Sequence, residues 1–118
     1  MQGLLEAGAN VAVGVQSDRF RGRAEAILGE FAGEGQRTGV FCCDVGDDAL
    51  IEASADRVAE ILETDTVHSL CHSIAYATAH GMQSPFLECT REDFRVAHEV
   101  SAYSLVAVAR AFQPMLAK

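Results

Sequence analysis

Short apolar runs and stretches with helical periodicity alternate along the whole chain, and this alternation restricts the possible folds more than any other feature. Three runs are typical of strands: Asn10 to Val15, Thr38 to Cys43 and Thr66 to Leu70. Apolar strands separated by helices indicate a parallel sheet that is covered on both faces and joined by right-handed crossovers. The sequence therefore predicts the α/β class, with a doubly wound parallel sheet.

The stretches between the strands carry the start and stop signals of helices. Gly8 suits the left-handed residue that ends a first helix, Asp18 can cap a second, and Asp47 or Asp48 can cap a third that runs to about Glu63. The apolar residues expected to face inward on the second and third helices are Phe20, Ala24, Ile27, Leu28, Phe31, Leu50, Ile51, Val58, Ile61 and Leu62.

The last predicted helix is the longest and runs from Thr90 to Leu116. Thr90 and Asp93 form a capping box at its start, and Pro114 costs one backbone hydrogen bond near its end. The residues expected along its packing face are Phe94, Ala97, Ser101, Leu105, Val108 and Phe112.

Composition narrows the range of functions. The 118 residues are 49% hydrophobic and 22% charged, which fits one globular domain. The net charge is −8 without a basic cluster, so nucleic acid is not an expected partner. No apolar run approaches the roughly 18 residues of a membrane span, and the N-terminus lacks the pattern of a signal peptide. We expect a cytoplasmic protein with no membrane association.

The cysteine pattern favours reduced thiols that serve as small core residues. Cys42 and Cys43 are adjacent in an apolar run, and no Cys-x-x-Cys pair occurs among the four cysteines. His68, Cys71 and His72 could meet at a strand end, but their spacing is not a recognised zinc signature. No metal site is expected.

Two segments carry a family resemblance. Residues 66 to 77 read Thr-Val-His-Ser-Leu-Cys-His-Ser-Ile-Ala-Tyr-Ala, and residues 97 to 105 read Ala-His-Glu-Val-Ser-Ala-Tyr-Ser-Leu. Together they resemble the enoyl-acyl carrier protein reductases of bacterial fatty acid biosynthesis, a branch of the short-chain dehydrogenase/reductases. The resemblance implies a partial Rossmann-like sheet of family strand order 3-2-1-4-5, in which this chain supplies the second, third and fourth strands.

The resemblance also implies a nicotinamide dinucleotide site beyond the carboxyl ends of the strands. Gln16 matches a glutamine that contacts the adenosine ribose, and Asp44 matches a carboxylate that accepts a hydrogen bond from the adenine amino group. Ala77 matches a position that touches the acyl substrate. The residues implied to bind the cofactor are Gln16, Asp44, Val45, Ser73, Ile74, Ala75 and Val100.

The turn after the first strand favours NADH as the cofactor. The neutral amide of Gln16 accepts a free 2′-hydroxyl and offers no cation to a 2′-phosphate. Arg19, Arg21 and Arg23 follow closely and keep NADPH open. An exposed turn that merely starts a helix is the plainer interpretation of this stretch.

The implied reaction is the NADH-dependent reduction of trans-2-enoyl thioesters carried on acyl carrier protein. In the family, a glycine-rich phosphate loop would precede Met1, and the catalytic tyrosine and lysine would follow Lys118. We therefore expect residues 1 to 118 to form a single partial dinucleotide-binding domain that is inactive alone and binds NADH weakly. Tyr76 and Tyr103 have no lysine at the expected helical spacing, so no catalytic residue is assigned within the chain.

The resemblance further implies a homo-oligomer, a tetramer in the family, for the full-length protein. The helix from Thr90 to Leu116 would be the subunit contact, with Phe112 turned outward.

Three other interpretations stay open. A ketoacyl reductase usually carries Asn-Asn-Ala-Gly where this chain has His72-Ser73-Ile74-Ala75. A phosphoacceptor receiver domain shares the length and the α/β alternation, but it needs an acidic pair and a lysine that are not placed here. A noncatalytic remnant that assembles with reductase subunits is the third.

Overall fold

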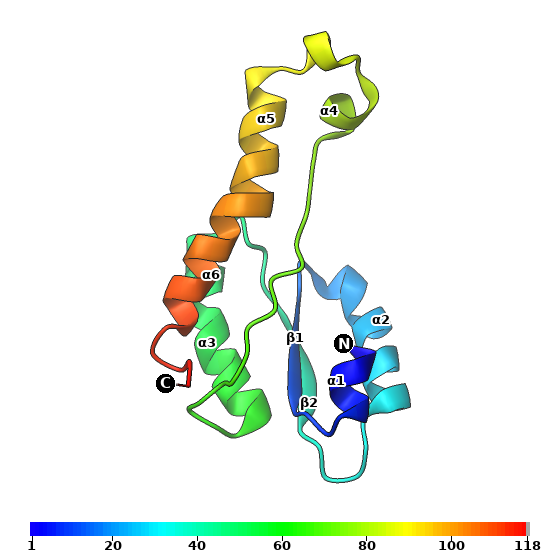
Figure 1. The fold of residues 1–118 in the computed structure, drawn as a ribbon, viewed down its shortest axis with the longest axis vertical. Helices are drawn as coiled ribbons and strands as arrows, with labels where there is room; N and C mark the ends of the chain where they lie inside the picture. The colour runs from blue at the N-terminus through cyan, green and yellow to red at the C-terminus, as the bar shows by residue number, and fades with distance from the viewer. Residues whose placement is uncertain (118) are drawn as a thin grey trace.

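The computed structural model describes residues 1–117 and confirms the α/β class (Figure 1). Lys118 lies outside the described residues. Strands and helices alternate in the first half of the chain, and the second half is helical or irregular. The elements are α1 (Gln2–Glu6), β1 (Val11–Val15), α2 (Asp18–Phe31), β2 (Thr38–Cys42), α3 (Asp48–Leu62), α4 (Ala79–Gln83), the 3₁₀ turn η1 (Phe86–Glu88), α5 (Arg91–His98), the π-turn η2 (Glu99–Tyr103) and α6 (Ser104–Phe112).

The sheet consists of β1 and β2, which pair in parallel from Val11 opposite Thr38 to Val15 opposite Cys42. In Figure 1, α1 and α2 lie on one side of this sheet and α3 and α6 on the other. Both strands were predicted to within one residue at each end. Helices cover both faces, as expected of apolar strands joined by helical crossovers.

The strand predicted from Thr66 to Leu70 is wrong. The segment is extended but irregular, and only Val67 forms an isolated bridge, with Leu116. The Val67 amide donates to Met115 O at 2.8 Å, and the Ala117 amide donates to Val67 O at 2.9 Å. A strand is defined by its paired neighbour, and no strand among residues 1–117 lies beside this segment to pair with it. Its backbone therefore pairs with the turn after α6 instead.

Local signals set most helix ends. Gly8 has φ 85°, and Asp47 accepts hydrogen bonds from the amides of Ala49 and Leu50, so both predicted roles are confirmed. Asp18 is not the cap, because the N-cap is Ser17; Asp18 is the first residue of α2, and its carboxylate binds Arg21 at 2.9 Å.

The prediction that Phe20 and Leu50 face inward is wrong. Phe20 is 46% exposed and Leu50 is 42% exposed. Each lies in the first turn of its helix, at the end where the chain leaves the sheet, so no second layer reaches it. Ala24, Leu28, Ile51, Val58 and Leu62 are buried as predicted.

The last helix is unbroken from Arg91 to Phe112, as predicted, but it is not regular throughout. It contains the π-turn η2, and it ends at Phe112 rather than Leu116, two residues before Pro114, which has no N–H to extend it. Phe112 is only 4% exposed and packs with Val58, Leu62 and Val67 in the main core, so the expectation that it faces outward is wrong. Phe94 and Leu105 are exposed instead.

The molecule is elongated, with extents of 52 × 30 × 23 Å. Its accessible surface of 8162 Å² exceeds the roughly 6,200 Å² expected for a compact monomer of this mass. Large apolar side chains contribute to this surface, including Met82, Phe86 and Leu87 at the tip formed by α4 and η1. No helix within residues 1–117 is long and apolar enough to cross a bilayer.

Candidate functional site

Two of the predicted cofactor residues meet at the carboxyl ends of the strands. Gln16 Nε2 donates to Asp44 Oδ2 at 3.2 Å, although 28 residues separate the two in sequence. The in-register pairing of β1 and β2 explains this contact, since the Cys43 amide donates to Val15 O at 2.8 Å, one residue before each side chain. The result is an exposed amide beside a half-buried carboxylate at one rim of the sheet.

The turn after β2 fixes the direction of the Asp44 carboxylate. Its Oδ1 accepts a hydrogen bond from the Gly46 amide at 3.0 Å while Oδ2 accepts from Gln16. A carboxylate has about four acceptor positions, so it can accept a further donor. Val45 follows and is half-buried. This donor and acceptor set fits an adenosine group, whose amino group donates and whose ribose hydroxyls both donate and accept.

Asp44 places acidic charge at this rim, and Arg21, five residues after Gln16, is bound to other groups. Arg21 binds Asp18 at 2.9 Å and donates through one terminal nitrogen to Val40 O at 2.7 Å. The hydrogen bond from Arg21, followed by that from Cys42, lowers the pKa of the Asp18 carboxyl. The hydrogen bond that the Cys42 thiol donates to Asp18, and then burial, raise the pKa of that thiol. Arg21 therefore binds Asp18 and the backbone at the edge of β2, and not the groups at the rim.

The third predicted segment, Ser73 to Ala75, is attached to the helices and not to the strands. His72, before it, has its Nε2 2.7 Å from Ser104 Oγ. Tyr76, after it, donates its amide to Ser101 Oγ at 3.0 Å and accepts from that hydroxyl at 3.1 Å through its carbonyl. No hydrogen bond within the described chain joins this segment to the rim at Gln16 and Asp44. The helical turn that holds it also carries Val100.

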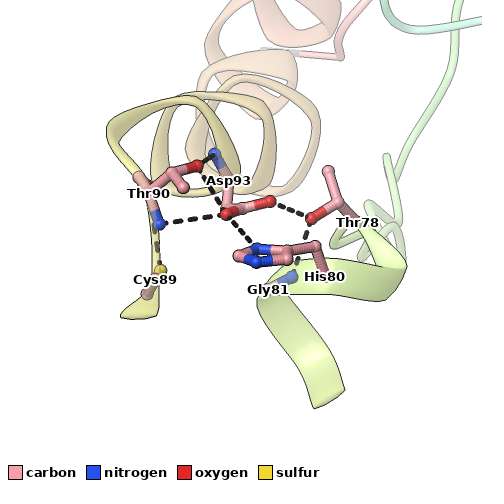
Figure 2. Close-up of polar contacts among 6 residues, drawn as sticks. All are labelled: Thr78, His80, Gly81, Cys89, Thr90 and Asp93. Carbon is pink, nitrogen blue, oxygen red and sulfur yellow. Dashed lines mark hydrogen bonds and ion pairs between the residues drawn. The ribbon is translucent and has the colours of Figure 1, made fainter. Parts of the chain in front are cut away.

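Ala77 is half-buried and leads into the polar cluster of Figure 2, in which Asp93 is the central acceptor. Asp93 is 7% exposed and accepts hydrogen bonds from the hydroxyls of Thr78 and Thr90, from the Thr90 amide at 3.0 Å and from His80 Nδ1 at 2.8 Å. The Thr78 hydroxyl, the Thr90 groups and His80, in that order, hold the pKa of the Asp93 carboxyl far below its usual range. The cluster fastens α4 to the start of α5.

The sequence identified only part of this cluster. The capping box of Thr90 and Asp93 is confirmed. Thr78 and His80 lie 15 and 13 residues earlier in the chain, and neither spacing is a recognised signal. Ser101 and Ser104 were missed as partners of the Ser73 segment for the same reason.

The thiols and possible metal ligands are dispersed. Within residues 1–117, no three His, Cys, Asp or Glu side chains gather where a metal ion could bind. Cys42 and Cys43 are half-buried, but Cys71 and Cys89 are exposed, so the prediction that all four cysteines are core residues is wrong for these two. Both lie in irregular segments of the chain.

Comparison with known proteins places this geometry in a family. The sequence profile described as Enoyl-(Acyl carrier protein) reductase matches residues 2–118. The enoyl-[acyl-carrier-protein] reductase [NADH] of Salmonella typhimurium is 34% identical over 116 residues, which are 98% of this chain and 42% of that protein. The chain therefore spans about two fifths of the length of this relative.

Solved structures agree with the sequence match. The enoyl-[acyl-carrier-protein] reductase (NADH) of Aquifex aeolicus VF5 superimposes with a TM-score of 0.83 at 26% identity, over 96% of this chain and 42% of that one. The Bacillus cereus enoyl-acyl carrier protein reductase, with NADP+ and indole naphthyridinone, gives 0.81 at 28% identity, over 93% and 41%. By profile, sequence and fold, the chain belongs to the enoyl-(acyl carrier protein) reductase family.

Proposed function

We propose that this chain carries the adenosine side of an NADH site, in a protein that reduces enoyl thioesters attached to acyl carrier protein. The contact between Gln16 and Asp44 is the observation that carries the proposal. It presents an amide, and a carboxylate that can accept a further hydrogen bond, at the sheet rim where α/β folds bind nucleotides. The family and the NADH named for the relatives agree with it.

Each predicted residue has a role in this proposal. Asp44 accepts from the adenine amino group, and Gln16 binds the ribose hydroxyls. Val45 and Val100 provide apolar contacts to the adenosine, and the small residues of the segment from Ser73 through Ile74 to Ala75 let the backbone approach the nicotinamide half. Ala77 contacts the acyl chain. These residues bind and orient, and bound nicotinamide would supply the hydride.

The charges at the rim favour NADH over NADPH. A 2′-phosphate next to Gln16 would lie beside the carboxylates of Asp18 and Asp44, and like charges at this range repel. Arg21 could compensate only by giving up Asp18 and Val40 O. The Bacillus cereus relative was solved with NADP+, so the preference requires a test on this chain.

We also propose that the outer face of α5 to α6 binds a second copy of the chain. Phe94, Tyr103, Leu105 and Val106 are each about half exposed on this helix. Large apolar side chains that are exposed on one helix are a usual sign of a protein contact. Light scattering at several concentrations decides between a monomer and an oligomer.

The experiment for the cofactor site is an NMR titration of the ¹⁵N-labelled chain with AMP, NADH and NADPH. AMP tests the adenosine side alone. We expect saturable shifts of the Gln16 side-chain amide and of the Asp44 and Val45 backbone amides, with NADPH weaker than NADH. Asp44→Ala should abolish them, and Asp48→Ala, an exposed carboxylate on the first turn of α3, is the matched control. Shifts that survive in Asp44→Ala would refute the assignment.

A further inference from the structure

The segment from Ser73 to Ala75 is fixed at both ends by hydroxyl groups from one helical turn. His72 and Tyr76 flank the segment directly, and they contact Ser104 and Ser101 across 32 and 25 residues of chain. The three residues between them are exposed and make no regular secondary structure. Their path is therefore set by two side chains of η2 and α6.

Ser101 binds Tyr76 as a neighbouring strand would. Its Oγ accepts from the Tyr76 amide at 3.0 Å and donates to the Tyr76 carbonyl at 3.1 Å. One hydroxyl therefore satisfies both backbone groups of a residue that has no strand partner.

Ser104 is completely buried and fixes the proton on His72. The Ser104 amide donates to Glu99 O, five residues back, which is the π-type bond of η2. The Ser104 hydroxyl then donates its only hydrogen to Val100 O at 2.6 Å. Its contact with His72 Nε2 at 2.7 Å must therefore be one in which the imidazole donates. With the Ser104 hydroxyl bonded to Val100 O, the neutral imidazole of His72 carries its proton on Nε2.

We propose that Ser101 and Ser104 are positioning residues, which hold Ser73 to Ala75 in the path that the nicotinamide half of the cofactor contacts. This inference rests on the proposed function. A segment that is already ordered does not lose conformational freedom when the ligand binds, so removing either hydroxyl should weaken binding without removing any ligand contact. A loss of roughly fivefold in NADH affinity is expected, the equivalent of about one hydrogen bond.

Two measurements on the ligand-free chain test the positioning directly. Amide exchange of Tyr76 should accelerate in Ser101→Ala and return toward the wild-type rate in Ser101→Thr, which restores a hydroxyl. Imidazole ¹⁵N shifts should report the Nε2-protonated tautomer of His72 in the wild type and a mixture in Ser104→Ala. Ser69→Ala, an exposed serine in the same extended stretch, is the control and should change neither.

The NADH titration then separates the two claims. Unchanged Tyr76 exchange in Ser101→Ala, or an unchanged His72 tautomer in Ser104→Ala, overturns the positioning role even where NADH binds. Absence of any NADH response in the wild type refutes the proposed function, while the ligand-free data still decide whether the hydroxyls order the segment. If Ser104→Ala does not fold, His72→Gln keeps a donor near the Nε2 position and His72→Ala removes it. A difference in the amide shifts of Ser73 to Ala75 between these two variants supports the role, and identical shifts contradict it.

Discussion

The substitution Gly8→Ala tests how the chain turns from α1 into β1. The Gly8 amide donates to Leu5 O at 2.9 Å and the Ala9 amide to Leu4 O at 3.0 Å, which together form a Schellman motif. Gly8 has φ 85°, and an added Cβ would meet nothing within 4 Å, so only the backbone conformation is penalised. The left-handed region costs a non-glycine residue ~1–2 kcal/mol, and the stiffer unfolded chain returns ~0.4–1 kcal/mol. The variant should lose about 1 kcal/mol of unfolding free energy.

Urea unfolding followed by circular dichroism measures this difference, with Gly3→Ala as the matched control. Gly3 lies within α1, and an added Cβ there also meets nothing within 4 Å. Its backbone is helical, so alanine should stabilise by ~0.5–1 kcal/mol. The two variants make the same chemical change with opposite expected signs. Equal midpoints for Gly8→Ala and the wild type would contradict the backbone explanation.

Two further outcomes are expected from the core and from the Asp93 cluster. Phe112→Ala should cost ~3–5 kcal/mol in urea unfolding because it opens a cavity among Val58, Leu62 and Val67, whereas Phe86→Ala, at a 90% exposed position, should change little. The native pKa of Asp93 is lowered, so its contribution to stability is complete above the ordinary carboxyl value and is lost as the pH falls through the lowered one. The difference in unfolding free energy between wild type and Asp93→Asn should therefore shrink below about pH 4, and a difference that stays constant would show that the ionised form is not the one stabilised.

Features encoded within a few residues were predictable from sequence. Asp47 caps α3 through amides two and three residues away, and the left-handed Gly8 lies between local hydrogen bonds to the carbonyls of Leu5 and Leu4. The absence of a strand from Thr66 to Leu70 was not predictable, because an apolar pattern reports burial and not the presence of a pairing partner. Val67 shows this, since it is buried yet pairs only with Leu116.

The candidate site divides in the same way. Gln16 and Asp44 could be placed together because the ends of adjacent parallel strands lie at one rim whatever the side chains are. The contacts of His72 with Ser104 and of Tyr76 with Ser101 depend on how a helix that contains a π-turn lies against an irregular segment. The periodicity of apolar residues in the sequence does not predict these two contacts.

The guanidinium of Arg21 lies against the backbone of β2 on the side away from β1, where Val40 O accepts its hydrogen bond. A charged group at that position obstructs any incoming chain, while β1 has no such guard within residues 1–117. Growth of a fibre through strand pairing requires two free strand edges on each molecule. Within residues 1–117, only the edge of β1 is unobstructed. Sheet-mediated association of the folded chain should therefore stop at pairs instead of growing into fibres.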